Sequence, residues 1–173
     1  MRRTPTPVAL AFVVLANVAA AQNVRIHLQA WTEPVLLDTI QVQREFRATP
    51  GQIYDAVLHA YPALDIPVGQ TANTQGIIGS ERFQRSRSLA GALLSKSFDC
   101  GEGPTGPYAD SYQLDIVVVA YVVPASGGGT RLGVSTIASG RDLTGPIRVP
   151  KGCHSTGRLE KLVFEEVTKR TGG

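Results

Sequence analysis

A long hairpin pattern between residues 111 and 139 restricts the fold of this chain more than any other feature. The run SYQLDIVVVAYVV is followed by the turn-rich stretch PASGGGT and by a second extended run, TRLGVSTIAS. In the first run every second side chain is apolar: Tyr112, Leu114, Ile116, Val118, Ala120 and Val122. The second run repeats the alternation with Thr130, Leu132, Val134, Thr136 and Ala138. Because strand side chains alternate between two faces, the pattern predicts two antiparallel strands that bury one shared face.

The opposite face of the first strand is polar at its start and apolar in its far half. It consists of Gln113, Asp115, Val117, Val119, Tyr121 and Val123. If helices cover the first face, the apolar half needs a separate cover. Two covers remain open: the N-terminal segment from Trp31 to Leu37, or a partner protein or second copy of the chain. The second alternative predicts a partner surface made of Val117, Val119, Tyr121 and Val123.

An amphipathic helix is predicted from residue 50 onward. Thr49 is a good N-cap, Pro50 fits the first helical position, and Gln52 completes a capping box. The apolar stripe has helical spacing and contains Ile53, Ala56, Val57, Ala60 and Tyr61. We expect this helix to end at Pro62.

A second amphipathic helix closes the chain. Its apolar stripe contains Leu159, Leu162, Val163 and Val167. Ser155 or Thr156 is expected to cap its start, and Gly172 fits its end.

Further extended segments are predicted at residues 24–29 and 34–47, and residues 65–87 are predicted to form two strands joined by a turn around Asn73. Arg44 interrupts the apolar side formed by Ile40, Val42 and Phe46. The stretch SLAGALLSKSFDC is interpreted as a short helix or loop. The order of these elements predicts an α+β domain in which an antiparallel sheet packs on two helices, with residues 22–40 as an extended N-terminal segment and 41–173 as the single domain.

The first 21 residues have the three parts of a secretory signal peptide. Arg2 and Arg3 precede a short apolar run, and the alanines at 19–21 fit a cleavage site before Gln22. We therefore expect a soluble periplasmic or extracellular protein that is not lipidated and has no transmembrane segment. Removing these residues from 173 leaves 152, and the formal net charge of +3 falls to +1. Such a charge gives no electrostatic case for nucleic-acid binding.

The two cysteines, Cys100 and Cys153, both lie in the part that is expected to be exported. An oxidising compartment favours a disulfide between them, which would close a loop of about 53 residues and stabilise the fold by about 4 kcal/mol. Free thiols, metal binding and catalysis are the other interpretations. Only three histidines are available, so zinc binding is disfavoured, and no metal or cofactor is expected.

Two motifs suggest chemistry that the surrounding sequence does not support. Gly101, Gly103 and Gly106 match GxGxxG, but prolines interrupt the motif and a strand is expected to follow it. Cys153 and His154 are adjacent, whereas a nucleophile and its base rarely come from neighbouring positions because neighbouring side chains diverge. No catalytic residue is therefore assigned.

The run REFRATPGQIYDAVLHAYPALDIPV, followed by paired strands and a closing helix, resembles helix-grip domains. The similar groups are the BamC-like domain of outer-membrane assembly lipoproteins and, more distantly, the START/Bet v 1-like superfamily. The resemblance covers about residues 41–173 and implies a curved sheet around a C-terminal helix. The chain has no lipobox and a shorter sheet than the START-like group. In style it is closest to exported bacterial proteins whose role is not characterised.

Three functions follow as hypotheses. The favoured one is a non-enzymatic interaction or envelope-assembly module that binds an envelope protein or itself, because GxSxG, HExxH and P-loop motifs are missing from the sequence. The alternative is a carrier of a small apolar ligand or lipid, in a pocket between the sheet and the C-terminal helix. The small residues Ala56, Ala60, Ala120 and Gly133 would leave room for it. The third is a hydrolase that uses Cys153 or Ser155 with His154.

Overall fold

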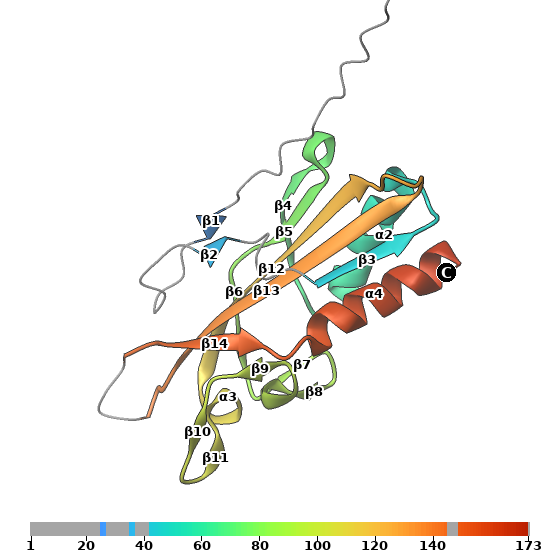
Figure 1. Ribbon diagram of the computed structural model, residues 1–173. Coiled ribbons are helices and arrows are strands. Elements are labelled where there is room, and N and C mark those ends of the chain that lie inside the picture. Colours follow the sequence, from blue (N-terminus) through green and yellow to red (C-terminus); the bar gives the residue numbers. More distant parts are fainter. Residues whose placement is uncertain (1–24, 27–34, 37–41, 145–148, 173) are drawn as a thin grey trace, which may run out of the picture.

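A computed structural model describes residues 25–26, 35–36, 42–144 and 149–172 (Figure 1). The predicted signal peptide and most of the predicted N-terminal extended segment lie outside these residues. The helices are α2 Pro50–Ala63, α3 Tyr108–Ser111 and α4 Arg158–Thr171, with 3-10 turns η1 Asn73–Gln75 and η2 Leu94–Lys96. The strands are β1 Arg25–Ile26, β2 Val35–Leu36, β3 Val42–Phe46, β4 Val68–Ala72, β5 Ile77–Ser80, β6 Phe83–Ser86, β7 Ser88–Leu89, β8 Ala92–Leu93, β9 Phe98–Asp99, β10 Glu102–Gly103, β11 Gly106–Pro107, β12 Gln113–Pro124, β13 Thr130–Arg141 and β14 Lys151–Ser155.

The predicted hairpin of β12 and β13 forms the centre of the sheet. The two strands pair without a break from Gln113 opposite Arg141 to Pro124 opposite Thr130. On the far side of β12 lie β5 and β6, and on the far side of β13 lie β3 and β14. All pairs in this sheet are antiparallel, so the predicted α+β class with an antiparallel sheet is confirmed.

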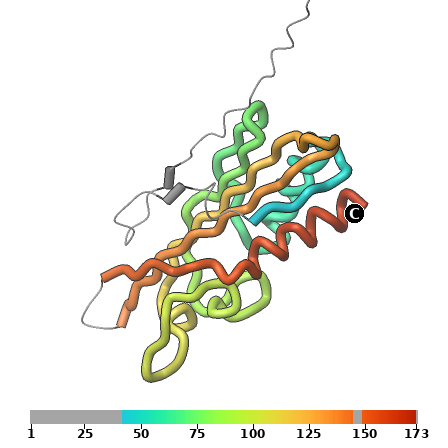
Figure 2. The backbone as a smooth tube through the Cα atoms, in the orientation of Figure 1, coloured from blue at the N-terminus to red at the C-terminus, as the bar shows by residue number. Residues whose placement is uncertain are grey.

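Helices α2 and α4 pack on one face of the sheet, which we call the helix-covered face (Figures 1 and 2). The alternating apolar side chains of the hairpin point to this face and are almost fully buried with the stripes of both helices. The main core members are Ile53, Val57, Ala60, Tyr61, Leu114, Ile116, Val118, Ala120, Leu132, Val134, Leu159, Val163 and Val167. The hydrophobic effect of burying these side chains holds the helices on the sheet.

Helix α2 begins as predicted and ends one residue later than predicted. Thr49 and Gln52 form the reciprocal capping box, with Pro50 in the first turn. The predicted end at Pro62 is wrong, because the helix includes Pro62 and continues to Ala63. The N–H of Leu64 closes the end by donating to the carbonyl oxygens of Ala60 and Tyr61. A proline is tolerated in this last turn, where few further helical bonds depend on it.

Helix α4 starts differently from the prediction. Gly157, with a φ of 84°, holds the N-cap position, so neither Ser155 nor Thr156 is the cap residue. Both hydroxyls still act on the turn: Ser155 Oγ accepts from the Gly157 N–H at 3.0 Å, and Thr156 Oγ1 accepts from the Arg158 N–H at 3.4 Å. The turn needs a left-handed residue between β14 and α4, and glycine adopts that conformation at the lowest cost.

The predicted disulfide is confirmed. Cys100 and Cys153 are bonded at 2.02 Å, with their Cα atoms 4.3 Å apart. The bond joins the residue after β9 to the centre of β14, and both cysteines are buried in the core. In the parts of the chain that the structure describes, no helix is long and apolar enough to cross a membrane.

Candidate functional site

The predicted partner surface lies on the face of the sheet opposite the two helices, which we call the second face. Val117, Val119, Tyr121 and Val123 alternate with the core residues of β12. Val119 is only 5% exposed, whereas Val117 and Tyr121 are half-buried and Val123 is 38% exposed. Val123 is therefore the most accessible of the four. The cover predicted from Trp31 to Leu37 falls outside the described residues except for Val35 and Leu36.

Ile137 on β13 completes this surface and was not predicted from the sequence. It lies opposite Val117 in the register of the two central strands, and it is 2% exposed. Val119 and Ile137 are both buried, yet neither belongs to the core cluster on the helix-covered face. The alternation along β13 could have identified Ile137, because it lies on the same face of the strand as Arg131, Ser135 and Ser139.

The polar end of the second face is a hydrogen-bonded cluster around Asp115. Asp115 is 6% exposed, and its carboxylate accepts from Gln84 Nε2 at 3.0 Å and from Arg141 Nη2 at 3.5 Å. The register explains the grouping, because Gln84 lies directly opposite Asp115 and Arg141 is opposite the neighbouring Gln113. Each carboxylate oxygen therefore has a partner, and these contacts stabilise a buried charge within the sheet.

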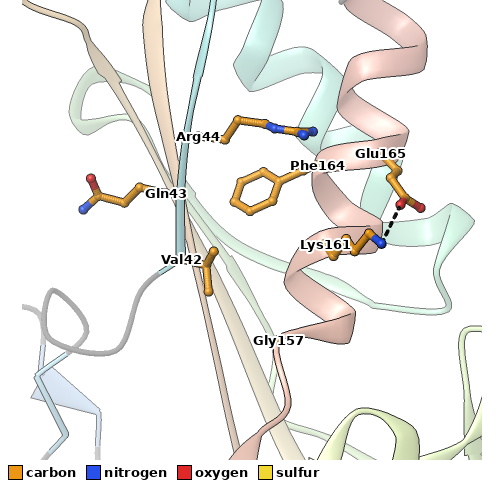
Figure 3. A pocket seen from close by; sticks show the side chains of 7 residues that line it. All are labelled: Val42, Gln43, Arg44, Gly157, Lys161, Phe164 and Glu165. Atoms are coloured by element: carbon orange, nitrogen blue, oxygen red, sulfur yellow. Dashed lines mark ion pairs between the residues drawn. The ribbon is translucent and has the colours of Figure 1, made fainter.

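A groove lies between the edge strand β3 and helix α4 (Figure 3). Its volume is about 260 Å³, and its lining is formed by Val42, Gln43, Arg44, Gly157, Lys161, Phe164 and Glu165. Figure 3 shows Val42 and Arg44 directed toward α4, whereas Gln43 points to the other side of the strand. The register agrees, because Val42 and Arg44 lie opposite the core residues Val134 and Leu132.

Charged side chains surround the apolar floor of this groove. Phe164 is buried at the centre, and the Arg44 guanidinium carbon lies 5.9 Å from its ring centroid. Arg44 Nη1 also donates to Thr168 Oγ1 at 3.5 Å. Lys161 and Glu165 form an ion pair at 3.9 Å with side chains 77% and 45% exposed. Arg44 and Lys161 outnumber Glu165, so the groove carries a formal charge of +1.

Strand β3 presents one free edge beside the groove. It pairs with β13, and in the part of the chain that the structure describes no strand pairs with its other edge. Residues 42–45 are all exposed, and Val42 is 44% exposed. An edge strand has a row of backbone N–H and C=O groups that can bond another chain. Arg44, on an otherwise apolar side of the strand, was the one indication of this site before the structure was known.

The residues of the hydrolase hypothesis do not form a catalytic arrangement. Cys153 is held in the disulfide. Ser155 Oγ donates to Glu160 Oε2 at 2.8 Å, and Glu160 is almost fully buried at the start of α4. His154 is exposed on β14, opposite Asp99 of β9. Ser155 and Glu160 therefore close the turn before α4, which is a structural role.

The glycine motif and the small core residues also have structural positions. Gly103 and Gly106 pair in the short hairpin of β10 and β11, followed by the four-residue α3 rather than by a dinucleotide-binding helix. Ala56, Ala60 and Ala120 are packed in the core, whereas Gly133 lies on the second face, so the four residues do not lie together at one site. Among the described residues no three His, Cys, Asp or Glu side chains are grouped as metal ligands.

Sequence comparison matches this chain to no family model and to no curated protein.

Proposed function

We propose that the protein is a non-enzymatic interaction module that acts outside the cytoplasm and binds an extended polypeptide segment along β3. The observation that carries the proposal is the exposed edge of β3 beside a groove whose other wall is α4. An added strand would gain main-chain hydrogen bonds from β3 and place alternate side chains in the groove. The helix-grip resemblance is consistent with such a role but adds no residue to it.

The size and lining of the groove favour a peptide over an apolar small molecule. Ligand pockets usually enclose roughly 300 to 1,000 Å³. This groove is smaller, and Arg44, Lys161 and Glu165 form its rim. A lipid tail would have to lie beside these charges. Extraction of the purified protein into organic solvent, followed by mass spectrometry, checks the alternative, which would require a stoichiometric lipid.

The proposed export has a direct test. Cleavage after Ala21 would leave Gln22 at the N-terminus, and intact-mass analysis of the protein recovered from cell fractions should show that end. A retained Met1 in the recovered protein would contradict export by a cleaved signal.

The second face is a further predicted contact of the same module. Val123 is its most exposed apolar residue, so Val123→Glu should weaken a self-associated form without disturbing the core. Light scattering of this variant and of the unchanged protein over a range of concentrations measures the effect. A monomer at every concentration for both proteins would leave this face without a role in self-association.

The test of strand addition uses a random heptapeptide library displayed on phage. Selected peptides are titrated into the isotope-labelled protein, and the backbone amide signals of residues 42–46 are followed by NMR. Selective shifts in β3 are the expected result. N-methylation at successive peptide positions should then reduce binding with a two-residue period, because alternate N–H groups of an added strand face β3. Shifts that map elsewhere would refute the proposed site.

A further inference from the structure

We infer that the segment bound by β3 carries an acidic residue opposite Arg44 and an apolar residue opposite Val42, two positions later in its sequence. The inference rests on the proposed function and specifies its partner: an extended peptide with the pattern acidic, any residue, apolar. Strand side chains on one face recur every second residue, which fixes this spacing.

Arg44 supplies the charge that such a segment would meet. Among the residues that the structure describes, no carboxylate pairs with Arg44, which contacts Thr168 Oγ1 and the ring of Phe164. Its guanidinium is therefore held beside the groove by a neutral oxygen and an aromatic face. A carboxylate can accept two parallel hydrogen bonds from this planar group, whereas a basic side chain in the same place would be repelled.

Lys161 adds to the same preference from the helix. Its ion pair with Glu165 is long and exposed, and pairs of this kind contribute little. Lys161 can exchange Glu165 for a carboxylate that enters the groove. Among the residues that line the groove, a basic peptide residue would meet one carboxylate, Glu165, and two cations.

The apolar position follows from the other end of the groove. Val42 is 44% exposed although it lies on the helix-covered side of β3, and Figure 3 places it across the groove from Phe164. Gly157 lines the groove near this end and has no side chain to fill it; a Cβ there would meet no atom within 4 Å. A leucine-sized side chain would cover Val42 and remove apolar surface from water.

The order of the two residues follows from the direction of the sheet. Each pairing in the described sheet is antiparallel, and antiparallel pairing is slightly more stable per residue. A segment antiparallel to β3 passes Arg44 before it passes Val42. The acidic residue therefore precedes the apolar one.

Four blocked heptapeptides of threonine test this pattern by NMR titration. The first has aspartate at its third position and leucine at its fifth. The second exchanges these two residues, the third has asparagine in place of aspartate, and the fourth has lysine. We expect the first peptide to shift the amides of residues 42–46 and to bind about five-fold more tightly than the asparagine peptide, the size of an exposed ion pair.

Two protein variants assign the preference to Arg44. Arg44→Gln should remove most of the advantage of aspartate over asparagine, with Lys161 keeping a remainder, while leaving the asparagine peptide unchanged. Gln43→Ala changes the neighbouring side chain that points away from the groove, so both affinities should stay as they are. Thermal unfolding of each variant checks that the fold is intact.

The outcomes separate the inference from the proposed function. If neither these peptides nor the phage-selected ones shift β3, both fail. If peptides bind along β3 but aspartate and asparagine bind equally, or the exchanged order binds as well as the first, the inference is overturned and strand addition stands. The same holds if only peptides with another pattern bind.

Discussion

The molecule has two regions that are stabilised in different ways. One, the sheet-and-helix layer, comprises β3–β6, β12–β14, α2 and α4. The other, which we call the disulfide lobe, comprises residues 88–111. The layer contains two twelve-residue strands and two fourteen-residue helices, whereas β7, β8, β9, β10 and β11 of the lobe have two residues each. Long elements can bury a continuous apolar stripe, and elements of two residues cannot.

The lobe compensates with bonds at single points. The disulfide joins the middle of the lobe to β14, and Asp110 near the end of the lobe accepts from both the N–H and the hydroxyl of Ser95. Thr156 lies in the turn before α4, and its Oγ1 donates a hydrogen bond of 2.7 Å to the carbonyl oxygen of Lys96 in the lobe. The lobe still adds Leu94 and Phe98 to the common core, so it is part of the same domain. The comparison predicts that the layer loses stability as a unit and that the lobe loosens locally.

The largest effect is expected from removal of the disulfide. Replacing Cys100 and Cys153 by serine together should lower the free energy of unfolding by about 4 kcal/mol, because the unfolded chain regains the freedom of a 53-residue loop. Urea denaturation measures the loss. Hydrogen exchange should show that the amides of the lobe lose more protection than those of β12. Equal loss in both regions would contradict the proposed division.

A core truncation in the layer provides the contrast. Leu132 is fully buried on the helix-covered face, so Leu132→Ala should cost about 3 kcal/mol through lost burial and a residual cavity. The loss of protection should be uniform over β12, β13 and α2. Leu93→Ala is the control, since Leu93 is 48% exposed and its truncation should change stability by less than about 0.5 kcal/mol.

A substitution at Asp110 tests how much the side-chain hydrogen bonds of the lobe contribute to stability. Asp110→Ala removes the acceptor of the two bonds from Ser95, at 2.8 and 2.7 Å, and should cost about 1.5 kcal/mol. Glu102→Ala is a matched control, because Glu102 is an exposed carboxylate of the same lobe. Differential scanning calorimetry compares the two. A similar change in both variants would show that the Ser95 contacts contribute nothing specific.

The sequence predicted the layer far better than the lobe, for a physical reason. Alternation over many residues identified β12 and β13, and the capping box identified the start of α2. The stretch SLAGALLSKSFDC was interpreted as a helix or loop, and its two hairpin strands β7 and β8 were missed. Strands of two residues are too short to show a period, and their turn lacks the usual Asn-Gly signal.

The candidate site, too, was predicted only in part: the second face was identified from the sequence, and the groove was not. Alternation placed Val117, Val119, Tyr121 and Val123 on one face, but it could not say how much of that face its own chain buries. The groove beside β3 depends on a strand and a helix more than 100 residues apart, and no local pattern encodes that contact. Arg44 was visible as a break in an apolar side. Its contact with the ring of Phe164 explains why a charged residue occupies this position.

The smallest effect is expected at the turn between β7 and β8, where the lobe holds a strained residue. Ala90 has a φ of 49°, a conformation that favours glycine, and Gly91 follows with a φ of 71°. Ala90→Gly should relieve that strain and raise stability by about 0.5 kcal/mol, after the added freedom of the unfolded chain is subtracted. Ala92→Gly lies two residues away in β8 without a positive φ, so the same substitution there should lower stability by about 0.5 kcal/mol. Opposite signs in urea denaturation would show that backbone strain, rather than side-chain volume, sets the stability of this turn; equal signs would mean that the turn is not strained.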